Sequence, residues 1–227
     1  MRALIDGASG PCLLLGVTPE LAVIRHPLVA IDWSAEMIAQ VWPGNEAGRT
    51  VVRADWLDMP FAPGSFAAAL GDGVVNMLPW PDSYYALAAR LKEAVRPGGR
   101  IVLRCFTAPE TPDALGALAS ELLNGSSSGF HAFKWRLAMA SAQGKPNLTM
   151  RHAWVAFERH FPDRERLSAA TGWSLATIAE IDDYRASPMQ KSFPTSTQLL
   201  QAFPGARLTH SGEYELSERC PLLVIDI

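Results

Sequence analysis

The amino-acid sequence predicts an α/β fold in which a largely parallel sheet is covered by helices on both faces. Over residues 1–106, short apolar runs alternate with helix-like stretches. The apolar runs are nearly continuous rather than alternating with polar residues, as is typical of strands buried on both faces. Glycine and proline residues separate many of these elements and mark the turns between them.

Five apolar runs predict the strands, and a polar residue or a glycine follows most of them. The runs are Cys12–Leu15, 28–31, 51–52, 66–70 and 101–106. Gly16, Asp32, Asp55 and Gly71-Asp72-Gly73 close the first four in turn. We therefore expect chemically active side chains at these strand ends, because ligands of open α/β sheets bind outside the carboxyl ends of the strands.

The stretches between these runs predict helices. Thr18-Pro19 is typical of a helix start, and Ser34 is positioned to cap a helix over residues 34–40. The clearest helix covers residues 82–96, with apolar residues on one face, and Pro97-Gly98-Gly99 is expected to end it.

The pattern changes after residue 106. Helical stretches over 113–124, 129–143 and 163–171 follow one another without convincing buried strands between them. Two strand-like segments, 206–209 and 222–227, complete the chain. We expect a single domain over residues 1–227, with a core of 1–106 and 205–227. Residues 107–204 are then a helical insert between strands five and six that covers the substrate.

Composition disfavours several classes of function. Twenty Lys and Arg against 23 Asp and Glu give a net charge of −3, which provides no basic excess for nucleic acid or anionic lipid. No run of 18 apolar residues predicts a membrane span. Residues 1–10 contain Asp6 and no long apolar stretch, so we expect no signal peptide and a cytoplasmic protein.

The cysteines and histidines indicate no metal site. Cys12, Cys105 and Cys220 are an odd number of cysteines, which excludes a fully paired disulfide framework, and none lies near another in sequence, which excludes a CxxC motif. The histidines lack HExxH or comparable spacing. Within the insert, the histidines that could act as a general base are His131, His152 and His160.

Asp32, Asp55 and Asp72 follow three predicted strands in succession, and Trp33 and Trp56 directly follow two of them. A carboxylate there can accept both hydroxyl protons of a ribose, and an indole offers a flat face to a purine. The alternative is that each Asp only caps the next helix. The three together favour a ligand that contains adenosine.

The first loop indicates which adenosine cofactor this is. Gly16-Val17-Thr18-Pro19-Glu20 lacks the GxGxxG pattern of a dinucleotide site, and Glu20 would repel a pyrophosphate. A nicotinamide oxidoreductase is therefore disfavoured. A cofactor without phosphate, S-adenosylmethionine, is favoured.

Four segments resemble successive motifs of the class I S-adenosylmethionine-dependent methyltransferases. They are LLLG (13–16), VAIDWSAEM (29–37), ADWLDMPF (54–61) and LKEAVRPGGR (91–100). The resemblance covers residues 12–106 and, more loosely, the last two strands. It implies a Rossmann-like, mostly parallel seven-stranded sheet that ends in an antiparallel hairpin.

The resemblance also implies a set of cofactor-binding residues. The loop from Gly16 through Val17 and Thr18 would lie near the methionine moiety, and the other residues would surround the adenosine and the sulfonium. Those residues are Asp32 at the ribose, Trp33 beside the adenine, Asp55 and Trp56 at the adenine edge, and Asp72 and Gly73 under the sulfonium. The sequence departs from the family's first motif, because Leu14 stands where an acid is usual and Thr18 and Glu20 stand where glycines are usual.

The favoured function is methyl transfer from S-adenosylmethionine to a small-molecule acceptor through an oxygen or nitrogen nucleophile. The alternative is a degenerate methyltransferase fold that acts as a non-catalytic binding or partner protein, which the altered glycine pattern keeps open. Residues 125–129 match the GxSxG pattern of hydrolases, but a helix rather than a strand is expected before them.

Overall fold

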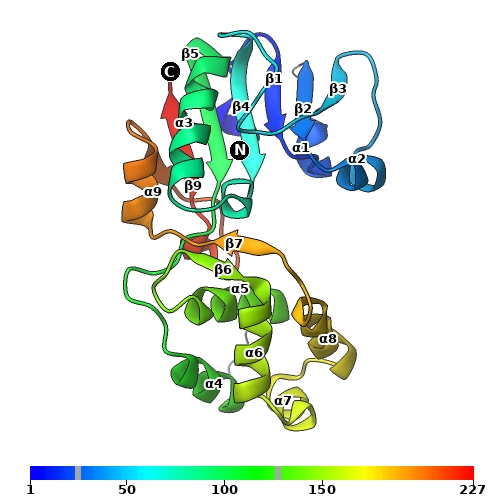
Figure 1. Cartoon of the computed structure of the whole chain (residues 1–227), viewed down its shortest axis with the longest axis vertical. Coiled ribbons are helices and arrows are strands. Elements are labelled where there is room, and N and C mark those ends of the chain that lie inside the picture. Colours follow the sequence, from blue (N-terminus) through cyan, green and yellow to red (C-terminus); the bar gives the residue numbers. More distant parts are fainter. Residues whose placement is uncertain (24–26, 126–128) are drawn as a thin grey trace.

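A seven-stranded sheet forms one end of the molecule and a helical lobe forms the other (Figure 1). The computed structural model describes residues 1–23, 27–125 and 129–227. The strand order is β3-β2-β1-β4-β5-β9-β8, and every pairing is parallel except those of β9 with β5 and β8. The strands are β1 Cys12–Leu15, β2 Leu28–Asp32, β3 Arg49–Arg53, β4 Phe66–Asp72, β5 Val95–Arg104, β8 Arg207–Thr209 and β9 Leu222–Asp226. The predicted Rossmann-like α/β fold is thereby confirmed.

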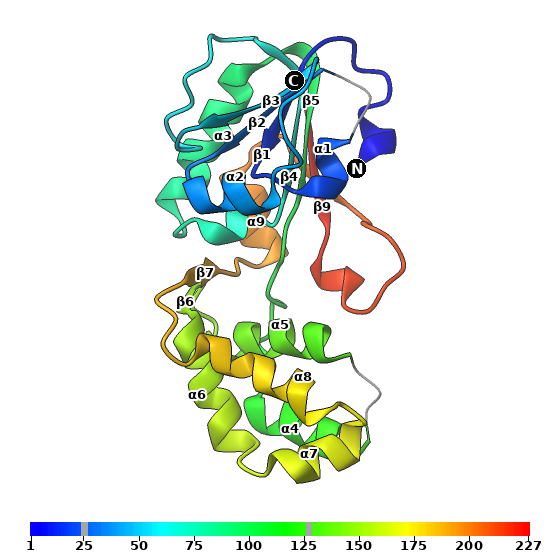
Figure 2. The same cartoon turned by 90° about the vertical axis from the view of Figure 1, so that its right-hand side faces the viewer.

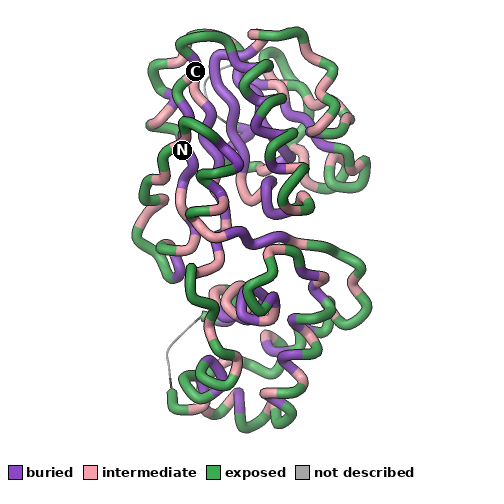
Figure 3. The backbone as a smooth tube through the Cα atoms, turned by 60° about the vertical axis from the view of Figure 1, so that its left-hand side comes forward, coloured by how far each residue is buried: buried purple, intermediate pink, exposed green. Residues whose placement is uncertain are grey.

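Helices cover both faces of the sheet, as Figure 2 shows. Leu13 and Leu15 pack on one face against α3 (Asp82–Ala94) and α9 (Ser196–Ala202). Cys12 and Leu14, which alternate with them along β1, pack on the other face with α1 (Pro19–Ala22) and the 3₁₀ turn η1 (Arg2–Leu4). Figure 3 shows the buried strands between these layers. The continuously apolar runs of the sequence correspond to this two-sided burial.

Local sequence signals place the elements near the strand ends. α2 (Ala35–Val41) begins where the Ser34 hydroxyl accepts a hydrogen bond from the Met37 N–H at 3.2 Å, as predicted. α3 ends at Ala94, before the predicted stop, and residues 97–99 lie within β5. The pairing of β4 with β5 changes register between Phe66 and Ala68. Pro97-Gly98-Gly99 therefore belongs to an irregular strand start rather than to the helix end.

The helical lobe, defined here as residues 113–192, has its own apolar core. Its elements are α4 Leu115–Leu123, α5 Phe130–Ser141, β6 Asn147–Thr149, α6 Met150–His160, α7 Arg164–Thr171, α8 Leu175–Ala179, the 3₁₀ turn η3 Glu180–Tyr184 and β7 Gln190–Ser192. Phe133, Phe157 and Phe161 are buried at its centre, with ring centroids 5.3–6.3 Å apart. The lobe therefore buries enough aromatic surface to pack as a unit of its own.

Three features of this part of the chain differ from what the sequence predicted. α6 was not predicted, although Met150, Ala153 and Phe157 give it an apolar face. The short strands β6 and β7 form an antiparallel pair where no strand was expected, because three residues are too few to show a pattern. α9 lies within the range 107–204, yet Leu199 and Phe203 pack into the core beside the sheet.

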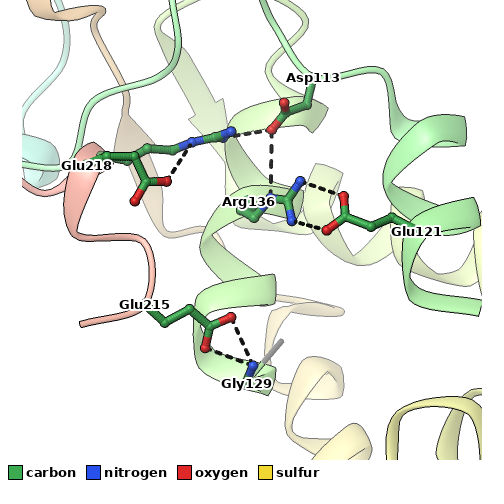
Figure 4. Close-up of polar contacts among 7 residues, drawn as sticks. Asp113, Glu121, Gly129, Arg136, Glu215 and Glu218 are labelled. Atoms are coloured by element: carbon green, nitrogen blue, oxygen red, sulfur yellow. Dashed lines mark hydrogen bonds and ion pairs between the residues drawn. The ribbon is translucent and has the colours of Figure 1, made fainter. Parts of the chain in front are cut away.

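A polar network joins the β8–β9 connection to the lobe, as shown in Figure 4. Arg219 donates to Asp113 at 2.7 Å, and Arg136 of α5 lies 4.0 Å from the same carboxylate. The Glu215 carboxylate accepts the Gly129 N–H at the start of α5, at 3.0 and 2.8 Å. These contacts fix one side of the lobe against the sheet. Within the described ranges, no helix combines the length and the apolar character that a membrane span requires.

Candidate functional site

The carboxyl ends of β4 and β5 point toward the lobe (Figure 1). The carboxyl ends of β2 and β4, together with the loops that leave β1, β2, β3 and β4, contain all nine predicted site residues. The site can therefore be built loop by loop, beginning at β1.

The loop after β1 combines a backbone turn with an uncommitted hydroxyl. Gly16 has φ +81°, and its N–H donates to the Ile31 carbonyl at 2.8 Å. This positive φ favours glycine, and a Cβ built at Gly16 would lie 3.9 Å from Oδ2 of Asp32, which places the turn beside that carboxylate. Val17 is buried, whereas Thr18 precedes α1 without using its side chain as a cap.

Asp32 ends β2 with one carboxylate oxygen committed and one available. The side chain is only 6% exposed, and Oδ1 accepts the Ser34 N–H at 2.8 Å. Oδ2 has no hydrogen bond within the part of the chain that the structure describes. Burial raises the pKa of Asp32, and the bond from Ser34 opposes this change. Asp32 therefore presents a free acceptor at the strand end.

Trp33 and Trp56 occupy opposite environments. Trp33 is 65% exposed beside Asp32, so its indole offers an open apolar face. Trp56 is 6% exposed, and its Nε1 donates to the Ile31 carbonyl at 2.8 Å. It packs in the core under α3. Asp55 beside it is exposed, and its Oδ1 accepts the Leu57 N–H at 2.8 Å.

Asp72 and Arg104, at the ends of adjacent strands, form a bidentate ion pair. Both N–H···O distances are 2.6 Å, and both carboxylate oxygens of Asp72 are engaged. Gly73 follows with φ +66°, and a Cβ there would lie 2.9 Å from the Phe106 ring. Asp72 thus enters the site with its charge already balanced, which the sequence did not predict. Gly73 provides the close approach between the β4 loop and Phe106.

Asn76 connects the β4 loop to the lobe and was not predicted. It is 1% exposed and lies in the 3₁₀ turn η2 (Val75–Met77). Its Nδ2 donates at 2.7 Å to the carbonyls of both Phe106 and Ser192, and its Oδ1 accepts the Phe106 N–H at 2.8 Å. The Ser192 hydroxyl also meets the Tyr84 hydroxyl at 2.7 Å.

A second link joins β6 to the same loop region. Asn147 accepts the Trp80 N–H and donates to the Trp80 carbonyl, each at 2.8 Å. The β6–β7 pair is thereby held against the segment that follows β4. No local sequence pattern predicts the bonds of Asn76 to Ser192 and of Asn147 to Trp80, because these partners lie 116 and 67 residues apart along the chain.

The remaining candidates lie elsewhere. His131 and His152 are exposed and His160 is half-buried on α5 and α6, and none has a hydrogen bond to the strand-end residues in the described ranges. Residues 126–128 of the GxSxG match lie outside the described residues. Among those that are described, no group of His, Cys, Asp and Glu side chains is placed to hold a metal ion. Cys12, Cys105 and Cys220 are buried free thiols.

Comparison with known proteins agrees with this architecture. Residues 7–103 match a family model described as a methyltransferase domain. Among curated proteins no relative matches the sequence. The chain is similar in structure to a Methanosarcina mazei protein described as a SAM-dependent methyltransferase, with a TM-score of 0.51, 13% identity and coverage of 98% of this chain and 94% of that one.

Two further structures show the same fold. The first is a Rhodobacter sphaeroides protein provisionally described as a Zn-dependent alcohol dehydrogenase, with a TM-score of 0.55, 12% identity and coverage of 98% and 87%. The second is the Burkholderia thailandensis 1,6-didemethyltoxoflavin-N1-methyltransferase with bound 1,6-didemethyltoxoflavin and S-adenosylhomocysteine. Its TM-score is 0.50, with 14% identity and coverage of 98% and 73%. At these identities the likeness shows the fold alone.

The matched residues contain β1 to β4, most of β5, and all the loops described above. The mostly parallel seven-stranded sheet with its antiparallel β8–β9 hairpin is the one that the sequence motifs imply. Residues 7–103, which are less than half of the chain, are therefore similar to a methyltransferase domain, and they contain the strand ends and loops of the candidate site.

Proposed function

We propose that this protein transfers a methyl group from S-adenosylmethionine to a small-molecule acceptor through an oxygen or nitrogen nucleophile. The observation that carries the proposal is the pairing of Asp32 with Trp33 at the end of β2. Oδ2 of Asp32 is an uncommitted acceptor at a site where its other oxygen is fixed, and an exposed indole lies next to it. A ribose diol and an adenine base require this combination.

The donor set fits a cofactor without phosphate. The loop after β1 carries Glu20 in its first helical turn, and α1 is only four residues long. Neither feature suits a pyrophosphate, which binds at the N-terminus of a longer helix. Gly16 and Val17 would instead form the backbone wall near the methionine chain, and the Thr18 hydroxyl, which does not cap α1, would provide a polar contact there.

The other strand ends have distinct roles in this proposal. Asp55, exposed after β3, would accept the exocyclic amine of the adenine, and Trp56 would line that edge while it supports β2. Gly73 would lie under the sulfonium. Asp72 would act at the same place through its pair with Arg104, which leaves the local charge balanced rather than negative.

Held by Asp32, Trp33 and the loop after β1, S-adenosylmethionine would supply an electrophilic methyl group whose leaving group is a neutral thioether. The protein's task is alignment and exclusion of water, because the reaction is an in-line displacement. The lobe faces the ends of β4 and β5 and would form the wall on the acceptor side (Figure 1). Lack of a dedicated base is compatible with this chemistry.

A small acceptor is favoured over a nucleic acid. The net charge is −3, and Arg104, Arg136 and Arg219 are all engaged with carboxylates. The Burkholderia thailandensis protein with the same fold binds a small heterocycle beside S-adenosylhomocysteine. Both observations support a small molecule as the acceptor.

Calorimetric titration with S-adenosylhomocysteine tests this proposal. We expect micromolar binding to the wild-type protein and a loss of about 100-fold or more in Asp32→Ala, since two charge-assisted hydrogen bonds are removed. Asp58→Ala, at an exposed carboxylate in the next loop, is the matched control and should bind as the wild type does. Equal affinity of the two variants would contradict the assignment of Asp32.

A further inference from the structure

Lys191 is an amine at the junction of lobe and sheet that has no carboxylate partner in the described chain. It lies in β7, next to Ser192, whose side chain points to Tyr84. Successive strand residues point to opposite sides. The Lys191 side chain therefore leaves the ribbon on the other side from the Ser192 link.

The surroundings of Lys191 are apolar. Its Nζ lies 5.5 Å from the centre of the Trp135 ring and donates to Sδ of Met77. Desolvation by these neighbours lowers the pKa of Lys191 to about 8. The nearby charged residues of α5 have their own partners, since Lys134 pairs with Glu180 and Arg136 pairs with Glu121. An ammonium in this position has a contact with a ring face but no counter-charge.

Lys191 also lies beside the end of β4. Met77 closes the turn η2, four residues after Gly73, and is 39% exposed. Trp135 stacks on Phe106, with centroids 4.5 Å apart and ring planes at 14°. Phe106 in turn contacts Gly73. A continuous path of side chains leads from the β4 loop to Lys191, along the boundary between sheet and lobe.

We propose that Lys191 is the acceptor-binding cation of this site and that the acceptor is a monocarboxylate with an apolar body. This inference rests on the proposed methyl transfer. The carboxylate would supply the missing counter-charge at Nζ, and Met77 would contact the apolar part. Because Arg104 is already paired with Asp72, a single ammonium is offered here, and it suits the one charge of a carboxylate better than the two charges of a phosphate monoester.

Binding of benzoate to the protein saturated with S-adenosylhomocysteine tests the inference, with benzamide as the neutral analogue and phenyl phosphate as the dianion. We expect benzoate to bind at least about tenfold more tightly than benzamide, which corresponds to the loss of one charge-assisted bond. Lys191→Met should remove this preference and Lys191→Arg should retain most of it. The matched control is Lys145→Met, at an exposed lobe lysine, which should behave as the wild type.

Three results would overturn the inference: absence of benzoate binding, equal binding of benzoate and benzamide, or an unchanged preference in Lys191→Met. Tighter binding of phenyl phosphate than of benzoate would identify a phosphate site and contradict the proposal that the acceptor is a monocarboxylate. The affinity for S-adenosylhomocysteine is measured separately in each variant and should not change. Failure of the wild type to bind that cofactor product would overturn the methyl transfer, whereas titration of benzoate into the unliganded protein would still test Lys191.

Discussion

The sheet core and the helical lobe hold their structures by different means. In the core, one buried strand such as β1 contributes side chains to both faces, so that Leu13 and Leu14 pack into separate apolar clusters. The lobe packs on an aromatic cluster, in which Phe133 contacts Phe157 and Phe161, and on a second apolar cluster beside it. The two regions meet through the hydrogen bonds of Asn76 and Asn147, through the pair of Arg219 with Asp113, and through the stacked rings of Phe106 and Trp135. The fold of each region is thus set by apolar packing, and their relative position by polar links together with this ring contact.

This difference predicts that the junction is the most sensitive polar point of the molecule. Asn76→Ala removes three hydrogen bonds to buried backbone groups of Phe106 and Ser192. We expect it to lower the free energy of unfolding by about 2–4 kcal/mol, because the freed groups stay without partners. Thermal unfolding measures the loss. Asn124→Ala, at an exposed helix end, should change stability by less than about 0.5 kcal/mol, and equal losses in the two variants would contradict the role of Asn76.

Lys191, at the same junction, should make the free energy of unfolding depend on pH. Its pKa in the folded state, about 8, lies below the ordinary value of 10.5, so the unfolded chain binds more protons between these values. Stability therefore rises with pH across this window. Lys191→Met should be more stable than the wild type at pH 7 by about 1–3 kcal/mol, and the difference should close above pH 10.5. Denaturant unfolding at pH 7, 9 and 11 tests this, and a constant difference would contradict it.

Trp56 and Trp33 separate stability from binding within the core. Trp56→Phe removes the donor to the Ile31 carbonyl and should lower the free energy of unfolding by about 1–2 kcal/mol. Denaturant titration measures this change. An unchanged midpoint and slope would show that the buried indole does not support β2.

Trp33→Ala should instead weaken ligand binding and leave the stability almost unchanged. Because this indole is 65% exposed, its removal should leave stability within about 0.5 kcal/mol of the wild type. The affinity for S-adenosylhomocysteine should fall about tenfold through the loss of base stacking. Calorimetry of the two tryptophan variants side by side gives the contrast, and a larger stability loss in Trp33→Ala than in Trp56→Phe would reverse the assignment.

The smallest effect is expected at the cysteines. Burial raises the pKa of Cys12 to about 11 and also raises the pKa values of Cys105 and Cys220. All three thiols are free. A reductant should therefore leave the unfolding temperature unchanged, and a thiol reagent should react only as the core unfolds. Rapid labelling of the native protein would show that the sheet core opens more readily than its packing implies.

The sequence allowed the core to be predicted because each of its signals is local. A run such as Cys12–Leu15 is buried on both faces, and Ser34 caps α2 three residues from its partner. The carboxylates at the strand ends follow from the strands, so Asp32 could be proposed as a site residue before its position was known. The pair of Asp72 with Arg104 joins residues 32 apart, and no local pattern contains it.

The lobe was harder to predict for the same physical reason. β6 and β7 are three residues each and are defined by their pairing rather than by their composition. Asn76 and Lys191 gain their roles from partners more than 100 residues away along the chain. Phe106 and Trp135 stack because α5 packs back against the segment that follows β5. Contacts between residues that are distant along the chain can be seen in the three-dimensional structure, but no local sequence pattern predicts them.

Parallel calorimetric titrations of the wild-type protein with S-adenosylhomocysteine and with NAD test the central claim most directly. The free Oδ2 of Asp32, the exposed Trp33 and the four-residue α1 predict micromolar binding of the first ligand and none of the second. Preferential binding of NAD would contradict the cofactor and indicate an oxidoreductase. Binding of neither would leave the methyltransferase fold without its cofactor, and the protein would then act as a non-catalytic partner.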